Sequence, residues 1–203
     1  MKKLDQTTRD KILAAALGEF HGNGFRGART GRIAEAAGIS RTMLHYYFNT
    51  KEALFEAVVG KTFGSVMPHL QNMAAAETSL AELVGNLVRA IADMLEENPG
   101  LPSFIVNILN ESPELLLNLT FLRDERSPDL LESVLKKARK AKQVRPGVTG
   151  EDLLINIYAL CSTPYLLAPY ISVKEGRDEA AMKKFIRGRR AGIVKLVLDG
   201  ISA

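Results

Sequence analysis

Apolar residues recur at helical spacing along most of this chain, and this pattern restricts the fold more than any other feature. Near the start, Ile12, Ala15, Ala16 and Phe20 follow the i, i+3, i+4 rule and would share one face of a helix. No run of alternating β-branched and aromatic residues bounded by hairpin turns occurs in the 203 residues. The sequence therefore predicts an all-α fold.

Capping and breaking residues divide the pattern into about nine helices. Thr7 or Thr8 can cap the first helix, the glycines of 21–24 can end it, and Pro68 breaks a longer one. Ser127-Pro128 combines a cap with proline at the first helical position. The predicted ranges are about 8–20, 30–37, 41–47, 51–67, 78–97, 102–110 with a turn or two from 113, 127–142, 149–168 and 178 onward.

Composition excludes several classes of protein. A single cysteine, Cys161, rules out a disulfide scaffold, and we expect it to be a small core residue. The three histidines, at 21, 45 and 69, are too dispersed to predict a metal site. The polar N-terminal segment has no signal-peptide core, and no apolar run reaches the ~18 residues of a membrane helix. We expect a soluble, cytoplasmic protein with no metal, cofactor or membrane partner.

Charge is distributed unevenly along the chain. Residues 1–51 carry nine Lys and Arg against four Asp and Glu, whereas residues 52–173 carry ten against fifteen. Residues 174–195 are again basic, with eight against three. A basic unit on a mildly acidic body favours an anionic partner, with nucleic acid as the leading candidate, although a solvated basic face would give the same counts.

Residues 30–48 have the order helix, glycine turn, helix, which is typical of a helix-turn-helix. Ile33, Ala37, Ile39 and Leu44 can share a core, and Gly38 supplies a turn conformation that side chains resist. The second helix would be ~10 Å long and fits a DNA major groove about 12 Å wide. It would expose charged, hydroxyl and aromatic groups suited to phosphates and bases. The exposed residues are Arg41, Thr42, Met43, His45 and Tyr46.

This part of the chain resembles the N-terminal domain of TetR-family transcriptional regulators. The resemblance lies in Thr8 to Phe20, Arg32 to Ser40, Leu44 to Phe48 and Lys51 to Leu54, about a quarter of the chain. It implies a three-helix DNA-binding domain at 1–50, with the helix-turn-helix at about 29–48, and a helical effector-binding and dimerisation domain at 51–203. It also implies a homodimer that binds a palindromic DNA operator and is released by a small molecule.

The resemblance implies roles for individual residues. Arg41, Thr42 and Met43 would read bases, with Ser40 capping their helix beside the DNA, while Leu44 and Phe48 would be core. The residues expected at phosphates, base edges or the DNA backbone are Arg29, Thr30, His45, Tyr46, Tyr47 and Lys51. His45 departs from the family's usual tyrosine. Because histidine titrates near neutral pH, a mild pH dependence of DNA affinity is one hypothesis, and an ordinary surface histidine is the other.

The second domain gives less specific information. Its pocket is predicted to be lined by Met94, Phe104, Asn107, Ile108, Tyr158, Cys161 and Tyr165, although each fits plain core as well. Aromatic residues with few charges favour an apolar or aromatic effector. The last two long helices, through Ile193, Val194 and Val197, are the expected dimer interface. The basic tract 183–190 is either a solvated face or an extra DNA contact.

We interpret the chain as a ligand-responsive DNA-binding regulator, most simply a repressor, and not as an enzyme. Two alternatives stay open. A helical ligand-binding or enzymatic bundle lacks support from any catalytic pair, because Glu96, Glu97, Glu111 and His69 are scattered. A non-specific nucleoid-type DNA binder would differ in the salt dependence and sequence specificity of its binding.

Overall fold

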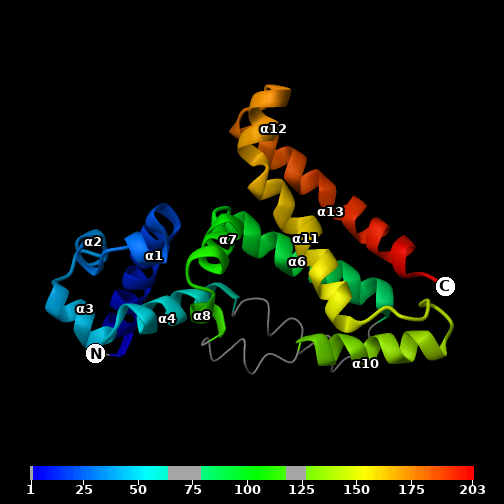
Figure 1. Cartoon of the computed structure of the whole chain (residues 1–203), viewed down its shortest axis with the longest axis horizontal. Coiled ribbons are helices and arrows are strands. Elements are labelled where there is room, and N and C mark those ends of the chain that lie inside the picture. The colour runs from blue at the N-terminus through cyan, green and yellow to red at the C-terminus, as the bar shows by residue number, and fades with distance from the viewer. Residues whose placement is uncertain (1, 64–78, 118–126) are drawn as a thin grey trace. The chain divides into compact units, whose positions relative to one another are not determined.

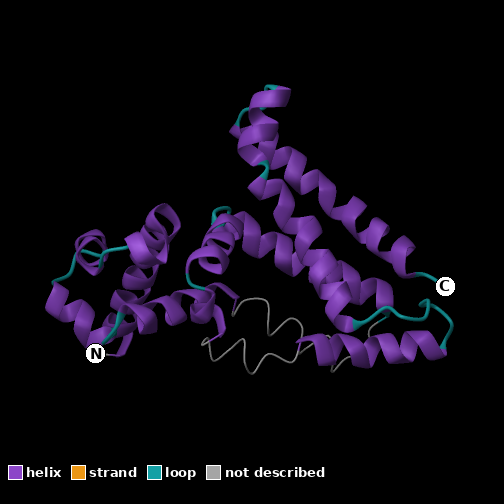
Figure 2. Ribbon diagram, viewed as in Figure 1, coloured by secondary structure: helices purple, strands orange, loops and turns teal. Residues whose placement is uncertain are grey.

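The computed structural model describes residues 2–63, 79–117 and 127–203 (Figures 1 and 2). These residues form eleven helices, and their only β-type pairing is an isolated bridge between Val144 and Ser202. The all-α prediction is confirmed. The contacts divide the chain into two compact units, which are described separately below.

The first unit contains the N-terminal helices and a later segment that starts at Ser103. Within it, α1 packs against α2 and α4, and α2 packs against α3. Its helices are α1 (Lys2–Gly27), α2 (Thr30–Ala36), α3 (Arg41–Tyr47), α4 (Lys51–Phe63), α7 (Leu101–Glu111, from Ser103 onward) and α8 (Pro113–Leu117).

A cluster of phenylalanines forms the core of the first unit. Phe20 lies 5.6 Å from Phe55 and 6.3 Å from Phe104, measured between ring centroids. Phe25 completes the cluster at 5.2 Å from Phe55. All four side chains are buried, so the burial of apolar area joins α1, α4 and α7 here.

The first helix runs further than the sequence predicts. It was expected to end at 21–24, but α1 continues to Gly27 across a break at Gly24, whose φ is 64°. Only glycine adopts this left-handed conformation at little cost, so the chain turns there and resumes helical geometry. The extra turn places Phe25 in the core and ties Arg26 to α7–α8, with Arg26 Nε donating to Ser112 Oγ at 3.2 Å.

The second unit is a helical bundle around α6. The apolar side of α6 is fully buried, and α6 packs against α10, α11 and α13. Its helices are α6 (Leu80–Glu97), α10 (Ser127–Lys140), α11 (Gly150–Leu166), α12 (Ala168–Glu175) and α13 (Glu179–Ile201). Three of them begin at capping side chains: Ser79 with a full capping box, Thr149 and Asp178.

Helix α12 was not predicted. The sequence was interpreted as one helix ending near 168–169 and another beginning at Asp178, whereas a separate helix fills Ala168–Glu175. Pro169 stands in its first turn, where a missing N–H costs nothing, and Gly176 ends it with φ 62°. Pro169 therefore marks the beginning of a new helix, α12, as well as a break in the preceding helical pattern.

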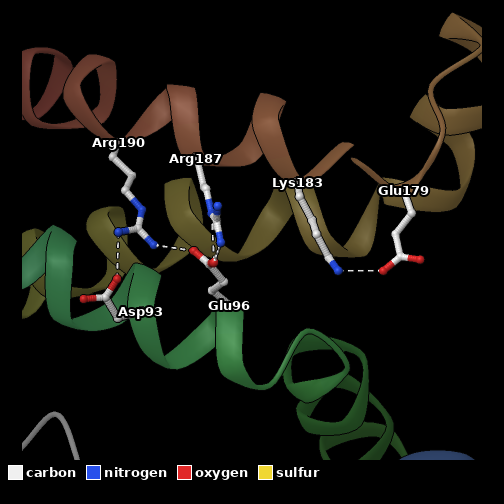
Figure 3. A network of polar contacts seen from close by, with 6 residues as sticks. All are labelled: Asp93, Glu96, Glu179, Lys183, Arg187 and Arg190. Atoms are coloured by element: carbon white, nitrogen blue, oxygen red, sulfur yellow. Dashed lines mark hydrogen bonds and ion pairs between the residues drawn. The ribbon is translucent and has the colours of Figure 1, made fainter. Parts of the chain in front are cut away.

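Ion pairs join α13 to α6 and involve part of the basic tract (Figure 3). Arg190 donates to Asp93 at 2.7 Å and to Glu96 at 2.8 Å, and the guanidinium of Arg187 also binds Glu96. The hydrogen bond from Arg187 lowers the pKa of the Glu96 carboxyl below its usual range. Lys183 pairs with Glu179 one turn earlier on α13 at 2.6 Å, so three cations of this tract are paired within their own unit.

The predicted end of the fourth helix at Met67 and Pro68 lies outside the described residues, as do His69 and the start of the next helix at Thr78. The proposed domain boundary at 50/51 stays a prediction, and α4 packs on α1 within the first unit.

Among the described residues, no single helix combines the length and hydropathy needed to cross a bilayer. Helices α11 and α12 reach that threshold only when counted together across a 54° bend.

Candidate nucleic-acid interface

The segment between α2 and α3 forms a tight turn that holds the two helices together. Gly38 takes φ 69°, and its N–H donates to the carbonyl of Glu35 at 3.0 Å. Ile39 N–H donates to the carbonyl of Ala34, also at 3.0 Å. Ile33, Ala34 and Leu44 are buried at the junction, which gives the helix-turn-helix that the sequence predicts.

Helix α3 is short and is fixed at both ends. Ser40 Oγ accepts the N–H of Met43 at 3.1 Å, which is the predicted cap. At the other end, Phe48 N–H donates to the carbonyl of Leu44 at 2.9 Å, and the Phe48 ring is buried with the Arg9 guanidinium 5.5 Å from its centroid. These contacts orient the remaining side chains of α3 outward.

The outward face of α3 carries the residues predicted to contact DNA. Arg41, Thr42, Met43 and His45 are exposed. Tyr46 is 83% exposed, and the partly buried ring of Tyr47 meets it edge to face at 5.6 Å. A largely exposed aromatic ring on a short basic helix is an unusual surface feature, and it suits contact with bases and phosphates.

The guanidinium of Arg41 lies against the first turn of α2. A Cβ atom added at Gly31 would stand 2.6 Å from Arg41 Nη2 and 2.8 Å from Arg41 Nε. The bare glycine therefore leaves room for this cation between the starts of α2 and α3. The sequence did not reveal this contact, since nothing in the residue pattern links Gly31 with Arg41.

Glu19 organises the start of α2. Its carboxylate accepts the N–H of Arg29 at 3.0 Å and lies 3.7 Å from Nε of Arg32. The Arg29 side chain is exposed, and Thr30 is partly buried. The two residues predicted to meet the DNA backbone thus stand on a turn held from α1.

Lys51 has internal partners. Its ammonium donates to the carbonyls of Phe25 at 2.9 Å and Ala28 at 3.3 Å, and it lies 4.5 Å from the centroid of the Phe25 ring. The residue is partly buried at the first position of α4. The sequence predicted a phosphate contact at this position.

The seven residues predicted to line an effector pocket fall into both units. Phe104, Asn107 and Ile108 belong to the first unit, where Phe104 and Ile108 are core and Asn107 is exposed. The other four belong to the second unit: Met94, Tyr158, Cys161 and Tyr165. Met94 and Cys161 are buried, and burial raises the pKa of the Cys161 thiol to about 11. Burial also raises the pKa values of Tyr158 and Tyr165.

A cavity of about 600 Å³ lies elsewhere in the second unit, between α11, α12 and α13. It contains none of the seven predicted residues. Its lining combines Phe185, Leu196 and other apolar groups with Asn156, Thr163, Arg145 and Arg189. The sequence did not predict this cavity because its residues come from three helices and from the segment between α10 and α11, and one of these helices, α12, was not predicted.

Two of the three apolar residues predicted for the dimer interface are buried within their own unit. Ile193 and Val197 are only 5% and 6% exposed, because that face of α13 packs on α6 and α11 within the unit. Val194 is partly buried. The exposed apolar residues lie on another face, with Leu196 of α13 58% exposed and Ile155 of α11 57% exposed. Helical spacing alone does not separate the apolar residues that pack internally from those that remain exposed.

Over the described ranges, no three His, Cys, Asp or Glu side chains gather as metal ligands.

Comparison with known proteins identifies the N-terminal segment. Residues 12–58 match the family model of the TetR-type bacterial regulatory proteins. The chain is 28% identical over 198 residues to the HTH-type transcriptional regulator RutR of Escherichia coli, covering 94% of this chain and 88% of RutR.

Solved structures share the fold over nearly the whole chain. A putative transcriptional regulator, SCO4942 of Streptomyces coelicolor, has a TM-score of 0.70 at 24% identity and covers 96% of this chain and 98% of its own. The regulator FadR of Bacillus subtilis, solved in complex with stearoyl-CoA, has a TM-score of 0.71 at 14% identity, with 94% and 98% covered. Residues 12–58 thus carry a TetR-type helix-turn-helix domain, and over nearly its whole length the chain is similar to a transcriptional regulator that bears such a domain.

Proposed function

We propose that this protein is a ligand-responsive repressor that binds a palindromic DNA operator as a homodimer in the cytoplasm, and that it has no enzymatic activity. The observation that carries the proposal is the outward face of α3. There Arg41, Thr42, Met43 and His45 are exposed, and Tyr46 protrudes beside them. Leu44 and Phe48 anchor the same helix in the core.

Contacts to DNA divide into base reading and backbone positioning. We assign Thr42, Met43 and Tyr46 to base edges in the major groove, with Arg41 at the edge of the same group. Arg29, Thr30 and Tyr47 flank this group on α2 and at the end of α3 and are assigned to the phosphate backbone. In a two-fold dimer the half-sites would be about one helical turn (~34 Å) apart or slightly more.

The dimer interface is assigned to the exposed face of α11, α12 and α13. These helices carry six exposed large apolar side chains: Ile155, Leu166, Leu167, Tyr170, Val173 and Leu196. Two of them, Leu167 and Leu196, also line the cavity between these three helices. A two-fold interface joins the same patch of both copies, so an apolar patch on one copy would pack against the identical apolar patch on the other.

A small molecule is assigned as the effector. FadR, which shares this fold, was solved with stearoyl-CoA bound, and this supports a small-molecule ligand for the present chain. Met94, Tyr158, Cys161 and Tyr165 stay the proposed contacts there, and their apolar and aromatic character favours an apolar ligand. Induction requires the effector to bind the non-DNA-binding state more tightly than the DNA-binding state.

Selection of random duplex DNA on the purified protein tests the proposal. A retained palindromic sequence, bound by a dimer, is the expected result. Retention of unrelated sequences that depends only on salt would replace the repressor with a non-specific DNA binder.

The selection also tests the assigned base readers. Thr42→Ala should relax the preference at one base position in each half-site, with a loss of ~1–3 kcal/mol for the preferred base. The matched control is Thr50→Ser, which keeps the cap on α4 through its hydroxyl and should leave the selected sequence unchanged.

A further inference from the structure

We propose that Lys51 is a positioning residue for the DNA-binding surface and makes little direct contribution to binding phosphate. The inference rests on the proposed DNA-binding function, and it assigns to Lys51 a role different from the phosphate contact that its sequence position implies. Its ammonium would hold the connection between α1 and α2, from which the DNA-facing residues Arg29 and Thr30 project.

The ammonium of Lys51 has hydrogen-bond partners inside the protein. Lys51 Nζ donates to the carbonyls of Phe25 at 2.9 Å and Ala28 at 3.3 Å, and the Phe25 ring lies 4.5 Å away. Two of its three N–H groups are therefore used inside the protein, and the aromatic face adds a cation–π contact. A lysine engaged in this way has little freedom to follow a phosphate.

The two carbonyls that Lys51 binds lie at the end of α1, where a helix leaves carbonyl groups without a donor. The last carbonyls of a helix have no partner within the helix and carry a partial negative charge. Phe25 stands in the last turn of α1, and Ala28 follows its end at Gly27. Lys51 satisfies two such groups at once and thereby caps α1 from the start of α4.

This contact from Lys51 lies at the connection between α1 and α2. On the opposite side of the same connection, the Glu19 carboxylate accepts the N–H of Arg29 at 3.0 Å. The backbone from Ala28 to Arg29 is thus held by a cation on α4 and an anion on α1. Because Arg29 is the N-cap residue of α2 and has no side-chain cap of its own, these two contacts fix where α2 begins.

Replacing the ammonium by an apolar group of similar length distinguishes a positioning role of Lys51 from direct phosphate binding. Lys51→Met keeps the stem against Phe25 and removes the donors. DNA affinity should weaken about tenfold, and by the same factor at every salt concentration, because a charge-assisted hydrogen bond that orders the surface is lost. The slope of log K against log salt should equal that of the wild type, whereas loss of a phosphate contact would reduce its magnitude by ~0.9.

Hydrogen exchange of the free protein provides a readout that does not involve DNA. In Lys51→Met the amides of Arg29, Arg32 and Ile33 should exchange faster, because Arg32 and Ile33 donate to the carbonyl of Arg29 in the first turn of α2. Lys61→Met is the matched control, because Lys61 binds Asp10 of α1 at 2.6 Å from the same helix and away from this turn. That variant should leave these three amides unchanged.

The outcomes are distinct. An unchanged salt slope with faster exchange supports the positioning role. A slope reduced by ~0.9, or unchanged exchange at Arg29, Arg32 and Ile33, overturns it. If Lys51→Met does not fold, Lys51→Gln, which keeps one amide donor group, takes its place in both measurements. Failure of the wild type to bind DNA would instead refute the proposed function, and the exchange result would still decide the role of Lys51 in the fold.

Discussion

At the scale of the residue, His21 is a titratable group placed against the core. Its ring lies 5.2 Å from the ring of Phe104, its Nε2 is buried, and burial lowers the pKa of the imidazole below its ordinary value of 6.5. The neutral form is therefore the one that fits between α1 and α7, and protonation opposes the packed state of the first unit.

This pKa shift predicts a pH dependence of stability. Above pH 6.5 the folded and unfolded chains both carry neutral His21, and stability has its full value. As the pH falls below 6.5, the unfolded chain binds the proton first, so the free energy of unfolding decreases until the folded form also titrates. Denaturant unfolding of the wild type and His21→Gln at pH 7.5 and pH 5 measures this, both pH values being chosen to bracket ~6.5. Between the higher and the lower pH, the wild type should lose more stability than His21→Gln. Equal losses in the two proteins would contradict the assignment to His21.

Single residues were predicted well where local chemistry determines their place. Ser40, Leu44 and Phe48 have positions that spacing and capping rules specify, and all three lie as predicted. Lys51 shows the opposite case, because its carbonyl partners come from residues more than twenty positions away. No local pattern encodes such a contact.

At the scale of the element, α3 depends on its cap. The helix spans only seven residues, so one hydrogen bond at its start is a large part of what holds it. Ser40→Ala should lower the free energy of unfolding of the first unit by about 1 kcal/mol, and it should weaken DNA binding as the helix frays. Ser40→Asn, which restores a capping oxygen, is the control and should recover both quantities. Retention of full DNA affinity by the alanine variant would show that α3 is held by its packing alone.

Helix boundaries were predictable where a cap or a glycine marks them. The start of α11 at Thr149 and the end of α12 at Gly176 use such residues. Helix α12 itself was missed because Pro169 was interpreted only as a breaker. The extension of α1 past Gly24 was missed because its stability comes from Phe25 entering an aromatic cluster that includes Phe104, far along the chain.

At the scale of the whole molecule, charge and apolar patterns had to be tested against packing. The basic tract was expected to be a solvated face or a DNA contact, yet Arg187 and Arg190 bind carboxylates of α6. Each of these ion pairs is partly exposed and contributes little alone, but Arg190 links Asp93 and Glu96 into one network. Likewise Ile193 and Val197 are internal, and this burial is why the dimer interface is proposed around the exposed Leu196 instead.

This surface gives the prediction that concerns the assembly. Leu196→Glu places a carboxylate on the exposed face of α13, and two-fold symmetry would bury that charge twice in the dimer. The variant should sediment as a folded monomer at concentrations where the wild type is a dimer. Its operator affinity should fall at least ~100-fold, because the second half-site is no longer bound by a tethered partner.

The matched control is Leu109→Glu, the same change at a leucine of α7 that is 53% exposed, and it should stay dimeric. A Leu196→Glu protein that remains a dimer would move the interface away from α13, and the cavity between α11, α12 and α13 would then face solvent and become the first place to look for the effector.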